Sequence, residues 1–381
     1  MKESISIKNL GPIKDIIIDG IKPFTVLIGE SGSGKSTLMK VIALFRWLYK
    51  QQNIESYLNA SNNAASFVLI SKKIFQNCGL DQFITDDTEI HYTVSFDGSY
   101  SYTIDYTKEK EYINSIRIDS NDISFSKIGF ISETRTIIPH WLNKAVSIKG
   151  ASLGFYFDEV LSDFNQAQEL TGGGIEMPFL NTHFHVTKNE LGKKYMVNSL
   201  ESDDFDIEYK DSSSGIKNVV PIALITEYFS KNFSFEKAFN RSVLDILSDS
   251  DNLTEFKPIR NLSTMEKKIF LHIEEPELSL YPDAQCALMD DLVSKCFINN
   301  KNEIELFIST HSPYIINHLN LLIKRFDKNA DGAKYSYDDI AVYQVVNGKI
   351  SDLKIQNERL INTNLLSETI NTIYSKYKKL G

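Results

Sequence analysis

Glycines, one lysine and several hydroxyl residues are grouped in a single short stretch, Gly29-Glu30-Ser31-Gly32-Ser33-Gly34-Lys35-Ser36-Thr37. The spacing G-x-x-x-x-G-K-[ST], which is typical of phosphate-binding loops, is complete here. Glycines let the backbone approach an anion closely, and the loop N–H groups and the start of the next helix attract negative charge. We therefore expect this stretch, the phosphate loop, to bind ATP, with Lys35 on the β- and γ-phosphates and Ser36 on Mg²⁺.

The segments on either side of the loop have the pattern that such a motif requires. Phe24 to Ile28 is a continuous apolar run, which predicts a strand buried on both faces. Residues 38–49 place apolar side chains at helical spacing, so a helix with one buried face follows the loop. This order of strand, loop and helix favours a true phosphate site over a chance match in a glycine-rich turn.

Two adjacent acids provide the second candidate site. The apolar run 270–273 predicts a short buried strand, and Glu274 and Glu275 follow it directly. Magnesium at a triphosphate needs a carboxylate from the core sheet, so we expect Glu274 to bind the metal opposite Ser36. Glu275 is then placed to polarise the attacking water. An ordinary solvated turn is the less favoured alternative, because a buried strand precedes the acids and the phosphate loop lies upstream.

Two further segments carry candidate residues. Ser213-Ser214-Gly215, which we call the serine segment, precedes an apolar helical pattern, so its N–H groups and hydroxyls are suited to a γ-phosphate. A simple helix cap is the alternative. His311 follows the predicted strand 304–308, where an imidazole can contact the γ-phosphate and sense hydrolysis. Taken alone, it would be a loop histidine with an ordinary hydrogen-bond partner.

In this order, the motifs resemble those of the ABC-type ATPase heads. The nearest resemblance is to the soluble branch that contains RecF, the SMC-like proteins and the OLD-family ATPases. The segment Glu274-Glu275-Pro276-Glu277-Leu278-Ser279-Leu280-Tyr281-Pro282 is similar to the OLD/RecF-like version, as is the opening Ile7-Lys8-Asn9-Leu10-Gly11-Pro12-Ile13. The resemblance covers most of the chain outside residues 136–205. It implies an AAA family ATPase similar to those of the Septu and retron-associated anti-phage systems.

The resemblance also implies roles for single residues. In that family, the serine of one subunit contacts the γ-phosphate that the other subunit binds, and Ser213 takes that part with Ser214 and Gly215 beside it. Glu275 is then the catalytic base, and His311 is the switch histidine. The implied assembly is a homodimer across ATP, or a larger oligomer built from such dimers.

The chain departs from the family pattern at two places. Ile216 follows the serine segment, where the family has Gln or Glu. The chain also has no secure glutamine for the loop that couples the nucleotide to the helical lobe. Gln76 is one candidate for that role. Ser132-Glu133-Thr134-Arg135 occupies the other equivalent position, with Arg135 expected near phosphate.

The resemblance and the pattern of strands predict an α/β fold of the ABC-type P-loop head. Residues 88–106 alternate apolar and polar around Asp97-Gly98, which predicts an antiparallel hairpin beside the parallel core. We expect the ATPase domain to comprise two halves, 1–135 and 206–381, and an inserted lobe at 136–205. An amphipathic helix near Phe155 to Leu170 and a hairpin around residues 189–192 are expected in that lobe.

Composition narrows the class of protein. The chain has 381 residues and a net charge of −9, which lowers the expectation of broad DNA coating but leaves room for a local basic groove. No apolar run approaches the roughly 20 residues of a membrane span, so no membrane role is expected. The first residues lack a signal-peptide core. The three cysteines form no C-x-x-C pair, so we expect reduced thiols in a cytoplasmic protein.

Three hypotheses of function follow. The first is an ATPase that dimerises on ATP and regulates a separate effector, such as a nuclease in bacterial anti-phage defence. The second is a RecF-like repair ATPase that binds duplex DNA directly, which ATP-dependent, salt-sensitive DNA binding would support. The third is a nucleotide-sensing scaffold with little turnover, which bound but unhydrolysed nucleotide would support.

Other patterns are weaker. Residues 51–66 are polar and predict a loose helix end or a loop. His183 and His185 alternate on one predicted strand, where a solvated face is favoured over a metal site because no third ligand lies nearby in sequence. Asp327 to Asp338 resembles a calcium-binding loop, but it ends in Asp rather than Glu and lacks evident flanking helices. A simple Asp-Gly turn is the favoured interpretation there.

Overall fold

A central six-stranded sheet organises the computed structural model, which describes residues 1–61, 69–96, 100–142, 154–189, 192–201, 206–248 and 265–380. The strand order is β14-β13-β3-β12-β11-β6, and every neighbouring pair is parallel except β13 with β14. The strands are β3 (Phe24–Ile28), β6 (Ser124–Ile131), β11 (Glu266–Glu274), β12 (Ile304–Thr310), β13 (Ile340–Val346) and β14 (Lys349–Asp352).

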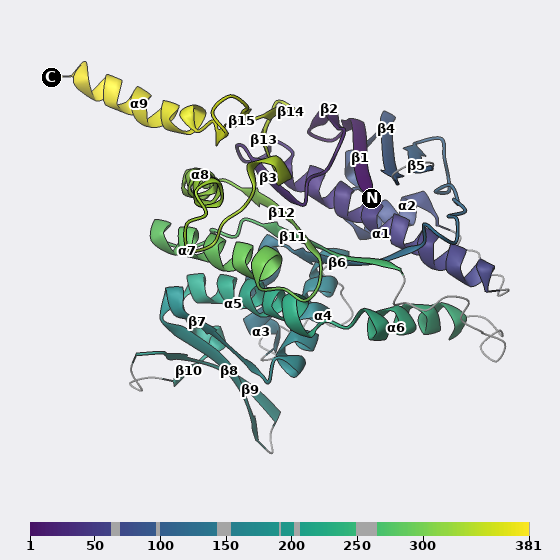
Figure 1. Ribbon diagram of the computed structural model, residues 1–381, viewed down its shortest axis with the longest axis horizontal. Helices are drawn as coiled ribbons and strands as arrows, with labels where there is room; N and C mark the ends of the chain where they lie inside the picture. The colour runs from purple at the N-terminus through teal and green to yellow at the C-terminus, as the bar shows by residue number, and fades with distance from the viewer. Residues whose placement is uncertain are drawn as a thin grey trace.

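A four-stranded antiparallel sheet forms a second layer, in the order β2-β1-β4-β5. Its strands are β1 (Lys2–Leu10), β2 (Ile13–Ile18), β4 (Ile84–Ser95) and β5 (Ser101–Thr107). Helix α1 (Lys35–Ala60) lies between this sheet and the central sheet (Figure 1). One hydrophobic cluster joins these layers and includes Ile7, Phe45 and Phe270, so the antiparallel flank shares a core with the parallel sheet.

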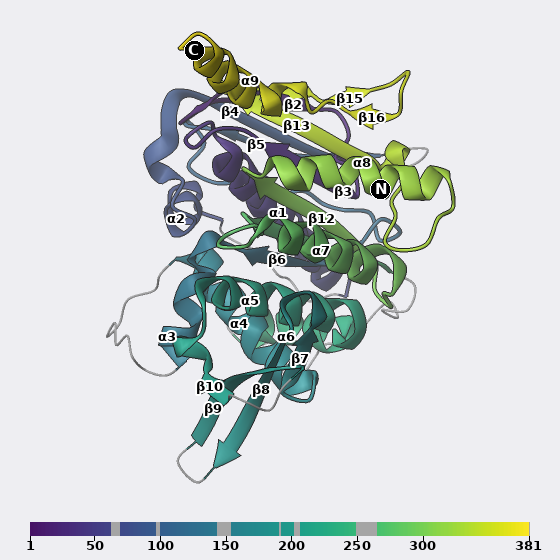
Figure 2. The same ribbon diagram turned by 90° about the vertical axis from the view of Figure 1, so that its left-hand side faces the viewer.

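The opposite face of the central sheet is covered by helices. Helices α4 (Phe155–Leu170), α5 (Ser214–Glu227), α7 (Pro282–Val293) and α8 (Pro313–Asp327) contribute to a second hydrophobic cluster there. Because side chains alternate along a strand, Val26 faces this cluster while Leu27 faces the first one. Figure 2 shows the resulting stack of layers, with the central sheet between α1 and these helices.

A third, antiparallel sheet projects from the α4–α5 side, in the order β10-β9-β8-β7 (Figures 1 and 2). Its strands are β7 (Gly174–Met177), β8 (Thr182–Asn189), β9 (Gly192–Ser199) and β10 (Asp206–Glu208). The remaining elements are α2 (Ser71–Asn77), α3 (Ile138–Leu142), α6 (Phe235–Ser248), α9 (Asn364–Lys378), β15 (Lys354–Ile355) and β16 (Leu360–Ile361). Short 3₁₀ turns are Asp81–Phe83, Glu133–Ile137, Pro178–Leu180, Tyr209–Asp211 and Tyr337–Asp339, and π turns are Tyr228–Asn232 and Ser294–Ile298.

The predicted fold class is confirmed, because a mixed α/β sheet carries an antiparallel flank. The amphipathic helix expected near Phe155 to Leu170 is α4 itself. Asp97-Gly98 and the middle of the turn at 189–192 lie outside the described residues, although antiparallel strands flank both. The division into 1–135, 136–205 and 206–381 stays a prediction. In the described part of the chain, no helix is both long and apolar enough to cross a membrane.

Residues 51–66 were predicted to form a loose helix end or a loop. The structure continues α1 as a regular helix to Ala60, so this prediction is wrong over 51–60, and residues 62–66 lie outside the described part of the chain. The side chains of Gln52 and Asn53 are buried there and bind the backbone of the segment that leads into β6 and of its first residue. Oε1 of Gln52 accepts from the Ile116 N–H at 2.8 Å, and Oδ1 of Asn53 accepts from the Ser124 N–H at 2.8 Å. Burial of polar groups is tolerated when they are hydrogen-bonded, so polarity here marks a contact rather than a helix end.

Candidate nucleotide site

The phosphate loop connects β3, in the interior of the central sheet, to the start of α1. Gly34 caps the helix with φ +106°, a conformation that a side chain would strain. Gly29 is required for a different reason, since a Cβ there would lie 2.4 Å from the carbonyl oxygen of Val345 in β13. The loop therefore has the backbone freedom and the close packing that its glycines predicted.

Lys35 is held inside the loop. Its Nζ donates to the carbonyl oxygens of Gly29 at 2.7 Å and Glu30 at 2.9 Å, and the residue is only 5% exposed. Burial lowers the pKa of Lys35, while the negative charges of Glu275 and Glu277 act in the opposite direction. The ammonium group thus lies among loop oxygens and interacts electrostatically with the acids that follow β11.

Glu274 ends β11 as a buried carboxylate, 1% exposed. Neither of its oxygens has a hydrogen-bond partner of good geometry in the described part of the chain. Burial, together with the neighbouring Glu133 carboxyl, raises its pKa to about 8, and the Ser36 hydroxyl acts against that rise. A buried carboxylate without a partner, next to a hydroxyl and a second acid, fits a divalent cation. Sequence reasoning placed Glu133 in a candidate segment but missed its contact with Glu274.

Glu275 begins what we call the acidic turn, residues 275–281. Its φ of +45° is unusual for a residue with a side chain, and its N–H donates to the Ser309 carbonyl at 2.8 Å. Its Oε1 lies 3.2 Å from Nε2 of His311, and each of these side chains is about one-third exposed. Solvent therefore reaches Glu275 and His311, the two residues that the sequence predicts to take part in ATP hydrolysis.

Glu277, which the sequence analysis quoted only as part of a motif, holds the backbone of His311. Its Oε1 accepts from the His311 N–H at 2.6 Å, while its Oε2 is buried without a partner in the described residues. Burial raises the pKa of the Glu277 carboxyl. Its position two residues after Glu275 was the available signal, but the long-range contact with the end of β12 was not visible in the sequence.

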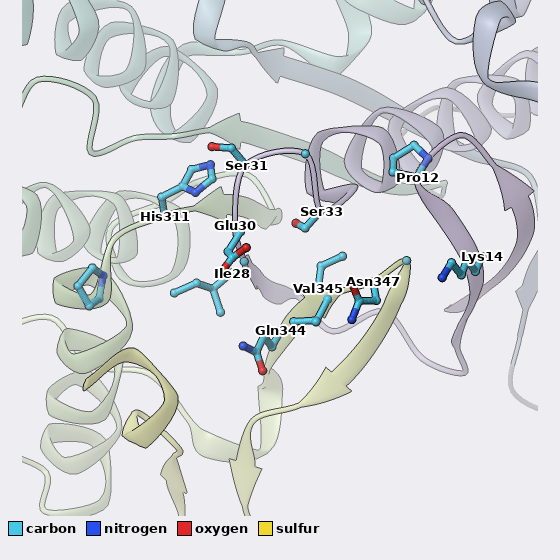
Figure 3. A pocket seen from close by; sticks show the side chains of 15 residues that line it. Pro12, Lys14, Ile28, Glu30, Ser31, Ser33, His311, Gln344, Val345 and Asn347 are labelled. Carbon is cyan, nitrogen blue, oxygen red and sulfur yellow. The ribbon is translucent and has the colours of Figure 1, made fainter. Parts of the chain in front are cut away.

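A cavity of about 850 Å³ opens beside the phosphate loop. Residues 28–33 form one wall, the β13–β14 turn at 344–348 forms another, and Pro12, Lys14 and His311 complete the rim. Figure 3 shows the side chains of Gln344 and Asn347 across the cavity from Ser31 and His311. The space adjoins the loop, and amide, hydroxyl and cationic groups suited to a polar ligand line it.

The serine segment is at the start of α5. Ser213 is exposed and caps the helix by accepting from the Ile216 N–H at 3.4 Å, and Ser214 is exposed beside it. Gly215 packs closely on the acidic turn, because a Cβ there would lie 2.9 Å from the Ser279 carbonyl oxygen. None of the three is among the residues that line the cavity in the described structure. The helix start thus faces outward.

Arg135, which the sequence predicts to lie near phosphate, sits against the backbone of Glu274 and Glu275 and is not among the residues that line the cavity. The residue is completely buried, and its guanidinium donates to backbone carbonyl oxygens. Those of Glu274 and Glu275 lie at 2.7 and 2.6 Å. Such a group braces the protein from inside and is not directed at an anion in the cavity. Gln76, the other candidate, lies in α2 beside the antiparallel sheet and is not among the cavity residues.

The residues of the calcium-like stretch and of the histidine pair contact other side chains of the protein. Asp327 and Asp338, the ends of the calcium-like stretch, both bind the Arg359 guanidinium. His183 and His185 stack with ring centroids 5.2 Å apart, and His185 lies 3.8 Å from Asp206. In the part of the chain that the structure describes, no group of three His, Cys, Asp or Glu residues is placed to hold a metal ion.

Comparison with known proteins bears on this arrangement of acids, histidine and serines. Residues 156–316 match the family model of an AAA ATPase domain. This stretch contains the serine segment, Glu274, the acidic turn and His311, and it begins downstream of the phosphate loop. The match therefore supports nucleotide binding from residues independent of the phosphate-loop motif.

SMC head domains are among the solved structures that match this chain. The SMC head domain from Thermotoga maritima is 13% identical with a TM-score of 0.38, and the match covers 93% of this chain and 99% of that chain. The Smc head domain from Pyrococcus furiosus, bound to the C-terminal domain of ScpA, is 11% identical with a TM-score of 0.40, covering 96% and 98%. No curated protein sequence matches this chain significantly.

Proposed function

We propose that this protein binds ATP with Mg²⁺ at the phosphate loop and hydrolyses it. The observation that carries the proposal is the meeting of Glu275 and His311, at 3.2 Å, at the same sheet edge as Lys35 and the unpartnered Glu274 carboxylate. A cation is needed to bind phosphates, an oxygen ligand to hold the metal, and a solvent-accessible base to activate water. We assign the cation to Lys35, the metal ligand to Glu274 and the base to Glu275.

Each residue has a role in this proposal. The phosphate loop from Gly29 to Thr37 holds the phosphates with its N–H groups, and Lys35 moves from its loop carbonyls to the β- and γ-phosphates. Glu274 and the Ser36 hydroxyl hold the metal, which when bound neutralises developing charge on the phosphates. Glu275 takes the proton of the attacking water, and His311 orients the Glu275 carboxylate.

We further propose a homodimer that closes across two ATP molecules. The support is the exposed helix start at Ser213, whose hydroxyl and first-turn N–H groups lie outside the cavity of its own chain. A helix N-terminus attracts a γ-phosphate when a second copy presents one. A two-fold arrangement then satisfies both serine segments at once.

The cellular role that we propose is regulation of a separate effector, such as a nuclease, in bacterial anti-phage defence. It rests on the resemblance of the motifs to OLD-like ATPases. A net charge of −9 gives less support to direct binding along duplex DNA. Identification of the proteins that co-purify with the native protein tests this role, and recovery of DNA without a protein partner would contradict it.

Size and mass measurements in solution test the ATP-linked dimer. We expect Glu275→Gln protein to accumulate as a dimer with ATP, because it retains the γ-phosphate. With ADP, which lacks the γ-phosphate, it should remain a monomer. Adding Ser213→Arg should prevent this dimer, because it places a long side chain at both ATP sites, whereas a mixed dimer carries it at one site. Ser234→Arg is the matched control, since Ser234 also accepts from a backbone N–H, that of Lys237 at 3.3 Å, at the start of α6. A dimer that forms equally with ATP and with ADP, or that persists when Ser213→Arg is added, would contradict the proposed interface.

A further inference from the structure

Arg135 connects three segments of the chain by hydrogen bonds to their carbonyl oxygens. Nε donates to Asn218 in α5 at 3.1 Å. Nη1 donates to Ser132 at 3.0 Å and to Glu274 at 2.7 Å, and Nη2 donates to Glu275 at 2.6 Å. A guanidinium presents its donors in a fixed planar fork, so these carbonyls are held at defined positions relative to one another.

The backbone of Glu275 needs this support. Its φ of +45° is a costly conformation for a non-glycine residue, and such conformations persist only where the surroundings fix them. The Glu275 N–H donates to the Ser309 carbonyl, and the Glu275 carbonyl accepts from Arg135 at 2.6 Å and from the Leu278 N–H at 3.2 Å. Together these contacts direct the Glu275 carboxylate toward His311.

Helix α5 is attached to the same turn by contacts of its own. Nδ2 of Asn218 donates to the Leu278 carbonyl at 3.4 Å, and Gly215 packs against the Ser279 carbonyl. Arg135 therefore lies behind a unit in which the acidic turn and the serine segment touch directly. Its fully buried position means that loss of the fork cannot be replaced by solvent.

We infer that Arg135 is a positioning residue that makes the acidic turn and the serine segment one rigid unit, and so couples the two nucleotide sites of the dimer. This inference rests on the proposed function, in which Glu275 serves the nucleotide of its own chain and Ser213 serves that of the partner. A displacement of the acidic turn on hydrolysis then moves the serine segment at the other site.

Arg135→Lys keeps the positive charge but replaces the guanidinium fork with one ammonium group. Mixed dimers separate its effect on the nucleotide site of its own chain from its effect on the nucleotide site of the partner chain. With excess Lys35→Ala chain, the working site uses the variant's own phosphate loop and acidic turn and an intact serine segment. With excess Ser213→Arg chain, the working site uses an intact phosphate loop and acidic turn, and only its serine segment comes from the variant. Wild-type chain in the same two pairings is the reference.

We expect Arg135→Lys to slow ATP hydrolysis in both pairings by on the order of tenfold or more, because small displacements of reacting groups are costly. Arg46→Lys is the matched control and should stay within about twofold, since Arg46 is an equally buried arginine whose partners Glu3, Glu305 and His272 lie outside the acidic turn and the serine segment. Melting temperatures and ATP affinities of the two variants establish that both are folded. Asn218→Ala retains the Asn218 carbonyl but loses the bonds of Nδ2 to the Leu278 and Ser214 carbonyls, so it should slow only the pairing with Ser213→Arg.

Three results would overturn a statement, two of them the coupling and one the proposed function. If Arg135→Lys slows the pairing with Lys35→Ala but matches wild type with Ser213→Arg, Arg135 supports only its own site and the coupling is wrong. If Arg135→Lys does not fold and Asn218→Ala leaves both pairings at the wild-type rate, the coupling is also wrong. If wild-type chain is inactive in both pairings although the chains associate, the proposed function is wrong instead, because it requires a site made from the phosphate loop of one chain and the serine segment of the other.

Discussion

Oε1 of Glu275 lies 3.2 Å from Nε2 of His311, so the residues that follow two neighbouring parallel strands meet at one edge of the sheet. The register places Glu274 opposite Ser309, which brings the next residues of both strands together. Glu277 secures the arrangement from the other side through the His311 N–H. The acid and the imidazole are therefore positioned by backbone geometry as well as by their own contact.

The two acids should differ in what their removal changes. We expect Glu275→Gln to retain ATP affinity and lose hydrolysis by on the order of 10²- to 10⁴-fold, because the amide keeps the shape but cannot accept the proton. Glu274→Gln should instead weaken Mn²⁺ binding to the ATP complex, because it removes the buried anionic oxygen. Single-turnover hydrolysis and paramagnetic detection of Mn²⁺ provide the two measurements. If Glu274→Gln abolishes hydrolysis and Glu275→Gln hydrolyses ATP at the wild-type rate, the two roles are reversed.

Removal of the Lys35 ammonium should weaken ATP binding severely. Lys35→Ala deletes a charge-assisted donor that the loop holds in place, so we expect affinity to fall by on the order of 100-fold. Titration with a fluorescent ATP analogue measures the change. Lys72→Ala in α2 is the control for charge alone, since Lys72 is exposed and outside the cavity. Equal affinities for the two variants would exclude the phosphate loop as the binding site.

The buried pair of Arg46 and Glu3 should contribute strongly to stability. Nη2 of Arg46 donates to Glu3 at 2.6 Å, and both side chains are almost fully buried between the antiparallel sheet and the central sheet. Arg46→Met leaves the buried Glu3 carboxylate without its cationic partner, although the Tyr92 hydroxyl still donates to it, so we expect the free energy of unfolding to fall by about 3–5 kcal/mol. Lys8→Met, which breaks the exposed pair with Glu89, should change it by less than about 1 kcal/mol. Urea unfolding that gives equal losses would contradict this assignment.

The polar second half of α1 should also be required for stability. Asn53→Leu removes the acceptor of the Ser124 N–H, so we expect a loss of about 1–3 kcal/mol from a buried unpaired donor. The neighbouring half-buried Gln51 supplies the control, and Gln51→Leu should cost no more than about 0.5 kcal/mol. Thermal unfolding compares the two variants. A stabilised Asn53→Leu protein would mean that α1 ends earlier in solution.

The sequence alone determined the features that depend on neighbouring residues. The phosphate loop was predictable because its strand, glycines and helix are contiguous from Phe24 onward, and the chemistry of the loop is a backbone property. Glu274 was predictable as a strand-end acid for the same reason. The amphipathic helix α4 was predictable because its apolar residues repeat with the helical period.

Tertiary structure decided the features that depend on distant partners. Arg135 was expected near phosphate, but its acceptors at Asn218 and Glu275 lie 83 and 140 residues away in the chain. Asn53 was expected near a helix end, but its partner Ser124 lies 71 residues away. A polar side chain has the same appearance in a sequence whether it meets water or a buried carbonyl. Only the packing of α5, β6 and β11 around Arg135 fixes which of the two it meets, because burial leaves the guanidinium no other acceptors.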